Sequence, residues 1–187
     1  MTTQSEVVSH LKRHVENGVP EGMTNFGHIY FAGEKAKVLG LVRSAKRANK
    51  LWENAVELGD LAAMRNLGAS YAKGDGVKMN VKKAMHFYRM ASDRGDAFSQ
   101  NDLGSMLAAR GNFKEALRYF QLAAEQGYAM AEFNIGHCFQ EGKGVEVDVQ
   151  EAKQWYVRAA DKGNEVAKHK LAAMRAPLDF GVQASRT

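Results

Sequence analysis

Residues 63–95 read AMRNLGASYAKGDGVKMNVKKAMHFYRMASDRG, and residues 131–163 repeat the same pattern as AEFNIGHCFQEGKGVEVDVQEAKQWYVRAADKG. Both stretches open on alanine, place an apolar residue and a glycine at positions five and six, and end on glycine. Self-similarity at a fixed period is the signature of a repeat architecture, in which each unit buries its apolar face against its neighbours. The period therefore decides the fold more than any single motif does.

An alanine marks the same place in four segments, at Ala48, Ala84, Ala116 and Ala152, with spacings of 36, 32 and 36 residues. An aromatic residue follows four positions later and a further alanine three positions after that, which puts small, large and small side chains on one helix face. A glycine suited to a left-handed helix C-cap closes each segment. The aromatic residues and closing glycines are Trp52, Tyr88, Phe120, Tyr156, Gly59, Gly95, Gly127 and Gly163.

A second column precedes each of these segments and consists of an apolar residue followed by glycine. Its members are Phe26-Gly27, Leu67-Gly68, Leu103-Gly104 and Ile135-Gly136. Glycine inside a helix costs about 1 kcal/mol relative to alanine, so its recurrence implies a close helix crossing. Each unit is thus expected to be helix A, a loop, helix B and a glycine turn.

These columns resemble the Sel1-like repeat, a relative of the tetratricopeptide repeat. The resemblance is fullest at 63–95 and 131–163, which carry the Gly-x-Gly-Val loop; the third unit lacks this loop, and the first has extra residues within 34–47. The resemblance implies an all-α, right-handed superhelical solenoid of antiparallel helix pairs. It also implies a protein-interaction module, in which the A helices line the concave face.

The predicted organisation is a set of four repeats between two capping helices. We expect an N-terminal cap at 1–18, repeats at 19–60, 61–96, 97–128 and 129–164, a C-terminal cap at 165–176 and a flexible tail at 177–187. Terminal helices with a polar outer face are typical of the ends of repeat arrays.

Composition indicates a soluble globular chain of 187 residues, 45% hydrophobic and 25% charged. No apolar run approaches the ~20 residues of a membrane span, and Met1 to Glu6 carries no secretory signal. Cys138 is the single cysteine, so no intrachain disulfide is possible. We therefore expect a cytoplasmic protein.

Residues with catalytic or metal-binding chemistry form no convincing constellation in the sequence. His10 and His14 stand at i and i+4, but no cysteine or carboxylate with ligand spacing joins them, so an exposed helix face is the better interpretation. The glycine loops follow helices rather than strands, and no Ser-x-x-Lys motif occurs. We predict no enzyme activity, no cofactor and no metal.

The predicted partner is a protein or peptide bound on the concave helix-A face. Residues expected there are Thr24, His28, Phe31, Arg65, Asn101, Ser105, Phe133, His137, Gln140 and His169. Phe31 and Phe133 are the candidate anchors, because aromatic residues dominate interface energetics; packing against a neighbouring repeat is the alternative.

A column of amides and one carboxylate precedes the apolar-glycine pairs, at Asn25, Asn66, Asp102 and Asn134. Such side chains suit hydrogen bonds to the backbone of an extended peptide. A structural role at the groove edge is an equally good interpretation of the same column.

A basic stretch in the enlarged first repeat is the other candidate surface. Its cations are Lys35, Lys37, Arg43, Lys46, Arg47 and Lys50, in a chain of net charge +5. With the apolar residues between them, they suit an acidic partner, nucleic acid or an anionic membrane. We favour an extension that folds its valines and leucines back onto the first repeat. Aromatic residues for base stacking are missing, so nucleic acid and membrane are the less favoured partners. The oligomeric state stays open.

Overall fold

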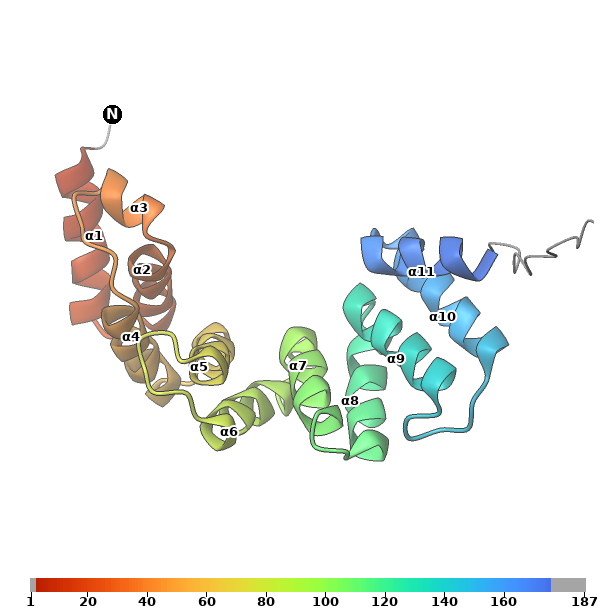
Figure 1. The fold of residues 1–187 in the computed structure, drawn as a ribbon. Coiled ribbons are helices and arrows are strands. Elements are labelled where there is room, and N and C mark those ends of the chain that lie inside the picture. Colours follow the sequence, from red (N-terminus) through yellow and green to blue (C-terminus); the bar gives the residue numbers. More distant parts are fainter. Residues whose placement is uncertain (1–2, 176–187) are drawn as a thin grey trace, which may run out of the picture. The chain divides into compact units, whose positions relative to one another are not determined.

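A computed structural model of the chain describes residues 3–175, which form eleven α-helices and no strand (Figure 1). The helices are α1 (Gln4–Glu16), α2 (Pro20–Ala32), α3 (Glu34–Val38), α4 (Ala45–Glu57), α5 (Leu61–Lys73), α6 (Val81–Ser92), α7 (Ala97–Ala108), α8 (Phe113–Glu125), α9 (Ala129–Glu141), α10 (Val149–Asp161) and α11 (Glu165–Arg175). The all-α prediction is confirmed. The predicted tail at 177–187 lies outside the described residues.

The chain divides into two compact units, Met1–Gly111 with α1 to α7 and Asn112–Thr187 with α8 to α11. The division falls in the turn of the third repeat, the repeat whose sequence lacks the Gly-x-Gly-Val loop. Each unit has its own buried side chains and is described by itself below.

The first unit is built from antiparallel helix pairs, α2 against α4 and α5 against α6, with α7 packed on α6 and with α1 and α3 on α2. Its core surrounds the buried Trp52 and Leu67. Side-chain caps begin the helices: Ser44, Asp60 and Asn80 each accept a hydrogen bond from the backbone N–H three residues on. Such caps satisfy N–H groups that the first helical turn leaves without partners.

The glycines of the apolar-glycine pairs lie where helix A crosses the aromatic residue of helix B. A Cβ added to Gly27 would lie 2.4 Å from Nε1 of Trp52, and one added to Gly68 would lie 2.7 Å from Cδ1 of Tyr88. In the second unit a Cβ on Gly136 would lie 2.8 Å from Cδ1 of Tyr156. The close crossings expected from the sequence are confirmed at these three sites, since only glycine leaves room for the ring.

The second unit packs α8 on α9, α9 on α10 and α10 on α11. Tyr156 and Leu171 belong to its core. Glu132 is completely buried, and its Oε1 lies 2.7 Å from Nζ of Lys162 and 3.3 Å from Nε of Arg158. Two half-exposed cations on α10 and in the turn after it thus balance the buried charge of α9.

Within residues 3–175, no helix has both the length and the apolar character required to span a lipid bilayer.

Candidate functional site

An open pocket of about 480 Å³ lies on α2 and α3 of the first unit. It is lined by Asn25, His28, Ile29, Phe31, Ala32 and Lys35. Gly33, with φ of 77°, turns the chain from α2 into α3 and so carries Lys35 to the pocket formed by α2. The pocket combines residues from both predicted surfaces: His28 and Phe31 of the helix-A face and Lys35 of the basic stretch.

The indole of Trp52 packs against two of the residues that line this pocket. Its ring centroid lies 5.4 Å from that of Phe31 and 5.5 Å from that of His28. Trp52 is itself fixed, because its Nε1 donates a hydrogen bond of 3.2 Å to the backbone carbonyl of Thr24. Phe31 therefore packs on helix B of its own repeat while one side of its half-buried ring lines the pocket.

His28 joins the pocket to the next helix A. Its Nε2 lies 3.0 Å from Nδ2 of Asn66 on α5. Burial lowers the pKa of His28, and the positive charges of Arg65 and Lys35 lower that pKa further. The imidazole is therefore neutral at pH 7, and its Nε2 accepts from the amide when Nδ1 carries the proton.

Two residues predicted for the open helix-A face lie inside the first unit instead. Thr24 is buried and its hydroxyl donates to Oδ1 of Asp60 at 3.0 Å. Asn101 is buried and donates from Nδ2 to Oδ1 of Asp102 at 3.2 Å. Helix A packs on helix B and on the adjacent repeat, so only part of its circumference stays open.

Ser105 and Arg65 occupy more open positions in the same unit. Ser105 is exposed and its hydroxyl donates to the backbone carbonyl of Asn101, one turn earlier in α7. Nη1 of Arg65 lies 3.2 Å from Oδ1 of Asp96, and its guanidinium lies 5.6 Å from the centroid of the Phe98 ring. Arg65 therefore ties α5 to the start of α7.

Two members of the amide column make side-chain hydrogen bonds within the first unit. Besides the contact of Asn66 with His28, Asp102 is bonded to the side chains of Tyr88 and Asn101. Burial raises the pKa of Asp102, and these two hydrogen bonds oppose the rise. Asn25 is exposed at the pocket. Asn66 and Asp102 therefore make hydrogen bonds within the first unit.

The remaining predicted residues of the helix-A face belong to the second unit. The centroid of Phe133 lies 5.4 Å from that of Tyr156, and Oε1 of Gln140 accepts from the Tyr156 hydroxyl at 2.8 Å. Nε2 of His137 lies 3.2 Å from Nζ of Lys143, and burial followed by this positive charge lowers the pKa of His137. His169 is exposed on α11. Phe133 therefore packs on helix B of its own repeat, which is the alternative to an anchor role.

Asn134, the last member of the amide column, is half-buried on α9 of the second unit.

The extra residues of the first repeat fold back only in part. Ala36 is fully buried and Leu41 packs against the core of the first unit. Val38 and Val42, in contrast, are 63% and 78% exposed. The insertion thus keeps two apolar side chains in solvent next to its basic residues.

The cations of the basic stretch differ in the contacts that they make. Nε of Arg43 donates to the backbone carbonyl of Phe31 at 3.1 Å, and the guanidinium of Arg47 lies 5.6 Å from the ring centroid of Tyr30. Nζ of Lys50 lies 3.8 Å from Oε2 of Glu53. Lys37 and Lys46 are exposed.

The potential metal and thiol residues do not converge. Across residues 3–175, no three histidine, cysteine, aspartate or glutamate side chains gather as a metal site. The rings of His10 and His14 lie 4.3 Å apart between centroids. Cys138 is buried, and burial raises the pKa of its thiol.

Ile29 and Ala32 line the pocket and were not among the predicted residues. Each follows a predicted residue directly in sequence, His28 and Phe31. The signal for them was Gly33, because α2 ends there and α3 packs on α2, which places the last turn of α2 beside Lys35 in one pocket.

The Sel1 repeat family model matches residues 20–60, 61–96, 97–128 and 129–164. A Sel1 repeat protein from Oxalobacter formigenes is 34% identical with a TM-score of 0.74, over 83% of this chain and 62% of that one. A protective antigen present in uropathogenic Escherichia coli strains, which displays an SLR fold, has a TM-score of 0.79 at 22% identity, over 97% of this chain and 38% of that one. The chain thus spans less than two thirds of either. A search among curated proteins gave no match.

Proposed function

The chain belongs to the Sel1 repeat family, and from this premise we propose that it is a non-enzymatic adaptor whose pocket on α2 and α3 receives a segment of a partner protein. Sel1 repeats generally serve as protein-interaction modules. The observation that carries the proposal is the pocket itself, because it joins an aromatic wall, an imidazole and an ammonium group in one open cavity of helix A.

The lining chemistry suits an apolar side chain of the partner followed by a carboxylate. Ile29 and Phe31 offer apolar contact, whereas Lys35 and Asn25 offer donors at the rim. The volume of about 480 Å³ lies within the ~300–1,000 Å³ range of ligand pockets. Because Trp52 already holds Phe31 and His28, little ordering entropy is lost when a partner binds.

Site-specific photocrosslinking tests this function. Benzoylphenylalanine replaces Ala32 in the pocket or, as a control, the exposed Glu57 on α4. We expect position 32 to crosslink to a partner protein and position 57 not to crosslink to that protein. The exposed neighbours Lys35 and Lys37 give a matched pair of charge reversals. Lys35→Glu should abolish the position-32 adduct and Lys37→Glu should preserve it; equal adducts in both variants would refute the pocket assignment.

A second candidate function rests on the exposure of Val38 and Val42 beside Lys37. This arrangement suits an acidic partner or an anionic surface. It predicts that the protein sediments with phosphatidylserine vesicles but not phosphatidylcholine vesicles, with less bound at higher salt and less in a Val38→Ser/Val42→Ser variant. Equal sedimentation with both lipids would remove this candidate.

A further inference from the structure

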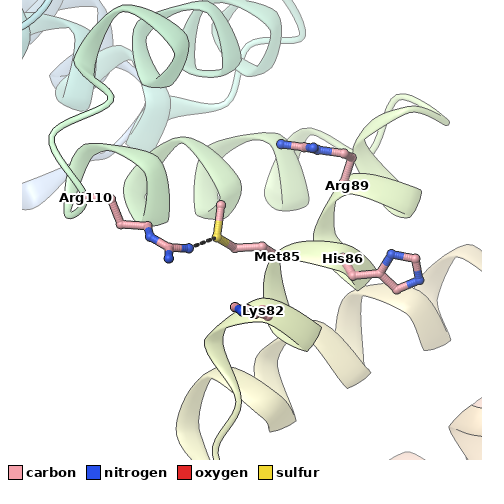
Figure 2. A pocket seen from close by; sticks show the side chains of 5 residues that line it. All are labelled: Lys82, Met85, His86, Arg89 and Arg110. Atoms are coloured by element: carbon pink, nitrogen blue, oxygen red, sulfur yellow. Dashed lines mark hydrogen bonds between the residues drawn. The ribbon is translucent and has the colours of Figure 1, made fainter.

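A second open pocket, of about 260 Å³, lies on α6 and the turn after α7, and it is lined by Lys82, Met85, His86, Arg89 and Arg110 (Figure 2). All five residues belong to the first unit. We propose that this pocket, separate from the one on α2 and α3, binds acidic side chains of a partner protein.

The helical repeat places the α6 residues of the pocket on one face. Lys82, Met85, His86 and Arg89 follow each other at spacings of three, one and three residues, and their positions at i, i+3, i+4 and i+7 form one stripe of the helix. α7 packs on α6 and brings Arg110 to the same stripe. The pocket lining therefore includes three positively charged side chains and the imidazole of His86.

Arg110 is held in place by a weak acceptor. Its Nη1 lies 3.1 Å from Sδ of Met85, and Figure 2 shows the guanidinium pointing toward this sulfur. A thioether accepts weakly, whereas a guanidinium presents five donors in a planar fork that matches a carboxylate. A carboxylate entering the pocket would exchange the sulfur for a charge-assisted, bidentate contact.

The lining of the pocket contains cations but no carboxylate. None of its lining residues is acidic, and α6 contains no aspartate or glutamate from Val81 to Ser92. The equivalent positions on α4, 36 residues earlier, include Lys50 and Glu53, which lie 3.8 Å apart as an ion pair. The lining therefore offers no carboxylate to Lys82 and Arg110, and an acidic side chain of a partner can supply one.

The chemistry favours an acidic protein segment over nucleic acid. Single-stranded nucleic acids bind through aromatic side chains on which their bases stack, together with a basic groove. No aromatic side chain other than the imidazole of His86 lines this pocket. A pocket of about 260 Å³ fits one or two carboxylate side chains, and the dominant contacts would be Arg–carboxylate and Lys–carboxylate pairs.

Fluorescence anisotropy with a labelled peptide of alternating glutamate and glycine tests the site. The control peptide has glutamine in place of glutamate. We expect the glutamate peptide to bind the full chain, the glutamine peptide not to bind, and the affinity to fall as salt rises toward about 0.15 M. Lys82→Ala/Arg110→Ala should weaken binding about tenfold or more, as expected for the loss of two charge-assisted contacts.

Matched variants separate a site from net charge alone. Lys12→Ala/Arg13→Ala removes one lysine and one arginine from the exposed surface of α1 and should change the affinity about twofold or less, because long-range effects of exposed charges are screened. Lys82→Arg/Arg110→Lys keeps the charge and should retain most of the binding. The proposal would be overturned if the two alanine double variants lost the same affinity for the glutamate peptide. It would also be overturned if the glutamine peptide bound as tightly as the glutamate peptide, or if a thymidine oligonucleotide bound more tightly and through the same pocket. Lys82→Ala/Arg110→Ala should leave the position-32 crosslink unchanged. A failure of the peptide experiment therefore does not affect the test of the proposed function.

Discussion

Gly68→Ala tests the helix crossing that recurs through the repeats. The added Cβ would lie 2.7, 2.8 and 3.0 Å from Cδ1, Cε1 and Cγ of Tyr88, a ring that is 3% exposed. Carbon atoms pack best at about 3.5–4.0 Å, so the overlap is about 1 Å. Overpacking of a well-packed core costs about 1–3 kcal/mol, and this enclosed ring belongs at the upper end. Helix propensity offsets about 1 kcal/mol of this cost, which leaves a net loss of about 2 kcal/mol.

Guanidinium denaturation followed by circular dichroism measures this loss, and the sign alone is decisive. If the helices did not cross closely at Gly68, helix propensity alone would make Gly68→Ala stabilise the protein by about 1 kcal/mol. A double-mutant cycle isolates the contact: in a Tyr88→Ala background, Gly68→Ala should no longer destabilise. A Gly68→Ala protein as stable as the wild type or more so, or an unchanged effect in the Tyr88→Ala background, would refute the crossing argument.

Three further outcomes are expected. Asp60→Ala removes both the N-cap hydrogen bond to Ala63 and the acceptor of the buried Thr24 hydroxyl, so it should lower the free energy of unfolding by about 2–3 kcal/mol in denaturation. The control Asn80→Ala removes only an exposed cap and should cost about 1 kcal/mol. Equal costs would contradict the role of Thr24. Trp52→Phe should cost about 1 kcal/mol or more, because it removes the Nε1 hydrogen bond to Thr24 and part of the ring area. A neutral result in the same assay would contradict the stabilising role of that hydrogen bond. The pKa of His28 is lowered in the folded state, so the unfolded state binds more protons as the pH falls below about 6.5, and the free energy of unfolding should fall there. His28→Asn should reduce this loss in thermal melts. A pH dependence of stability that this substitution leaves unchanged would contradict the assignment.

The repeat columns predicted the helix crossings because the cause of each crossing lies within one repeat. A glycine in helix A and an aromatic residue in helix B recur together, so the sequence alone indicated where two helices approach closely. The structure places the rings of Trp52 and Tyr88 against Gly27 and Gly68, as that pattern predicted. The family resemblance and this periodicity together describe the helix pairs.

The open surface was harder to predict, because exposure depends on contacts between repeats. Thr24 is buried and its hydroxyl is bonded to Asp60, which lies 36 residues later and caps α5, the first helix of the next repeat. Phe133 lies on the same face of α9 as His137 and Gln140, but its ring packs against Tyr156. The basic pocket on α6 escaped the sequence analysis because Arg110 reaches it from the turn after another helix. Helical periodicity fixes which residues share a face, and tertiary packing decides which part of that face stays open.

The most direct test of the protein-binding role is to map the position-32 crosslink on the partner and to titrate that segment, made as a peptide, into the protein. The account predicts an apolar residue next to a carboxylate in the mapped segment, and binding that Lys35→Glu weakens about tenfold while Lys37→Glu leaves it within about twofold. A mapped peptide that binds both variants as tightly as the wild type would contradict docking in the pocket on α2 and α3.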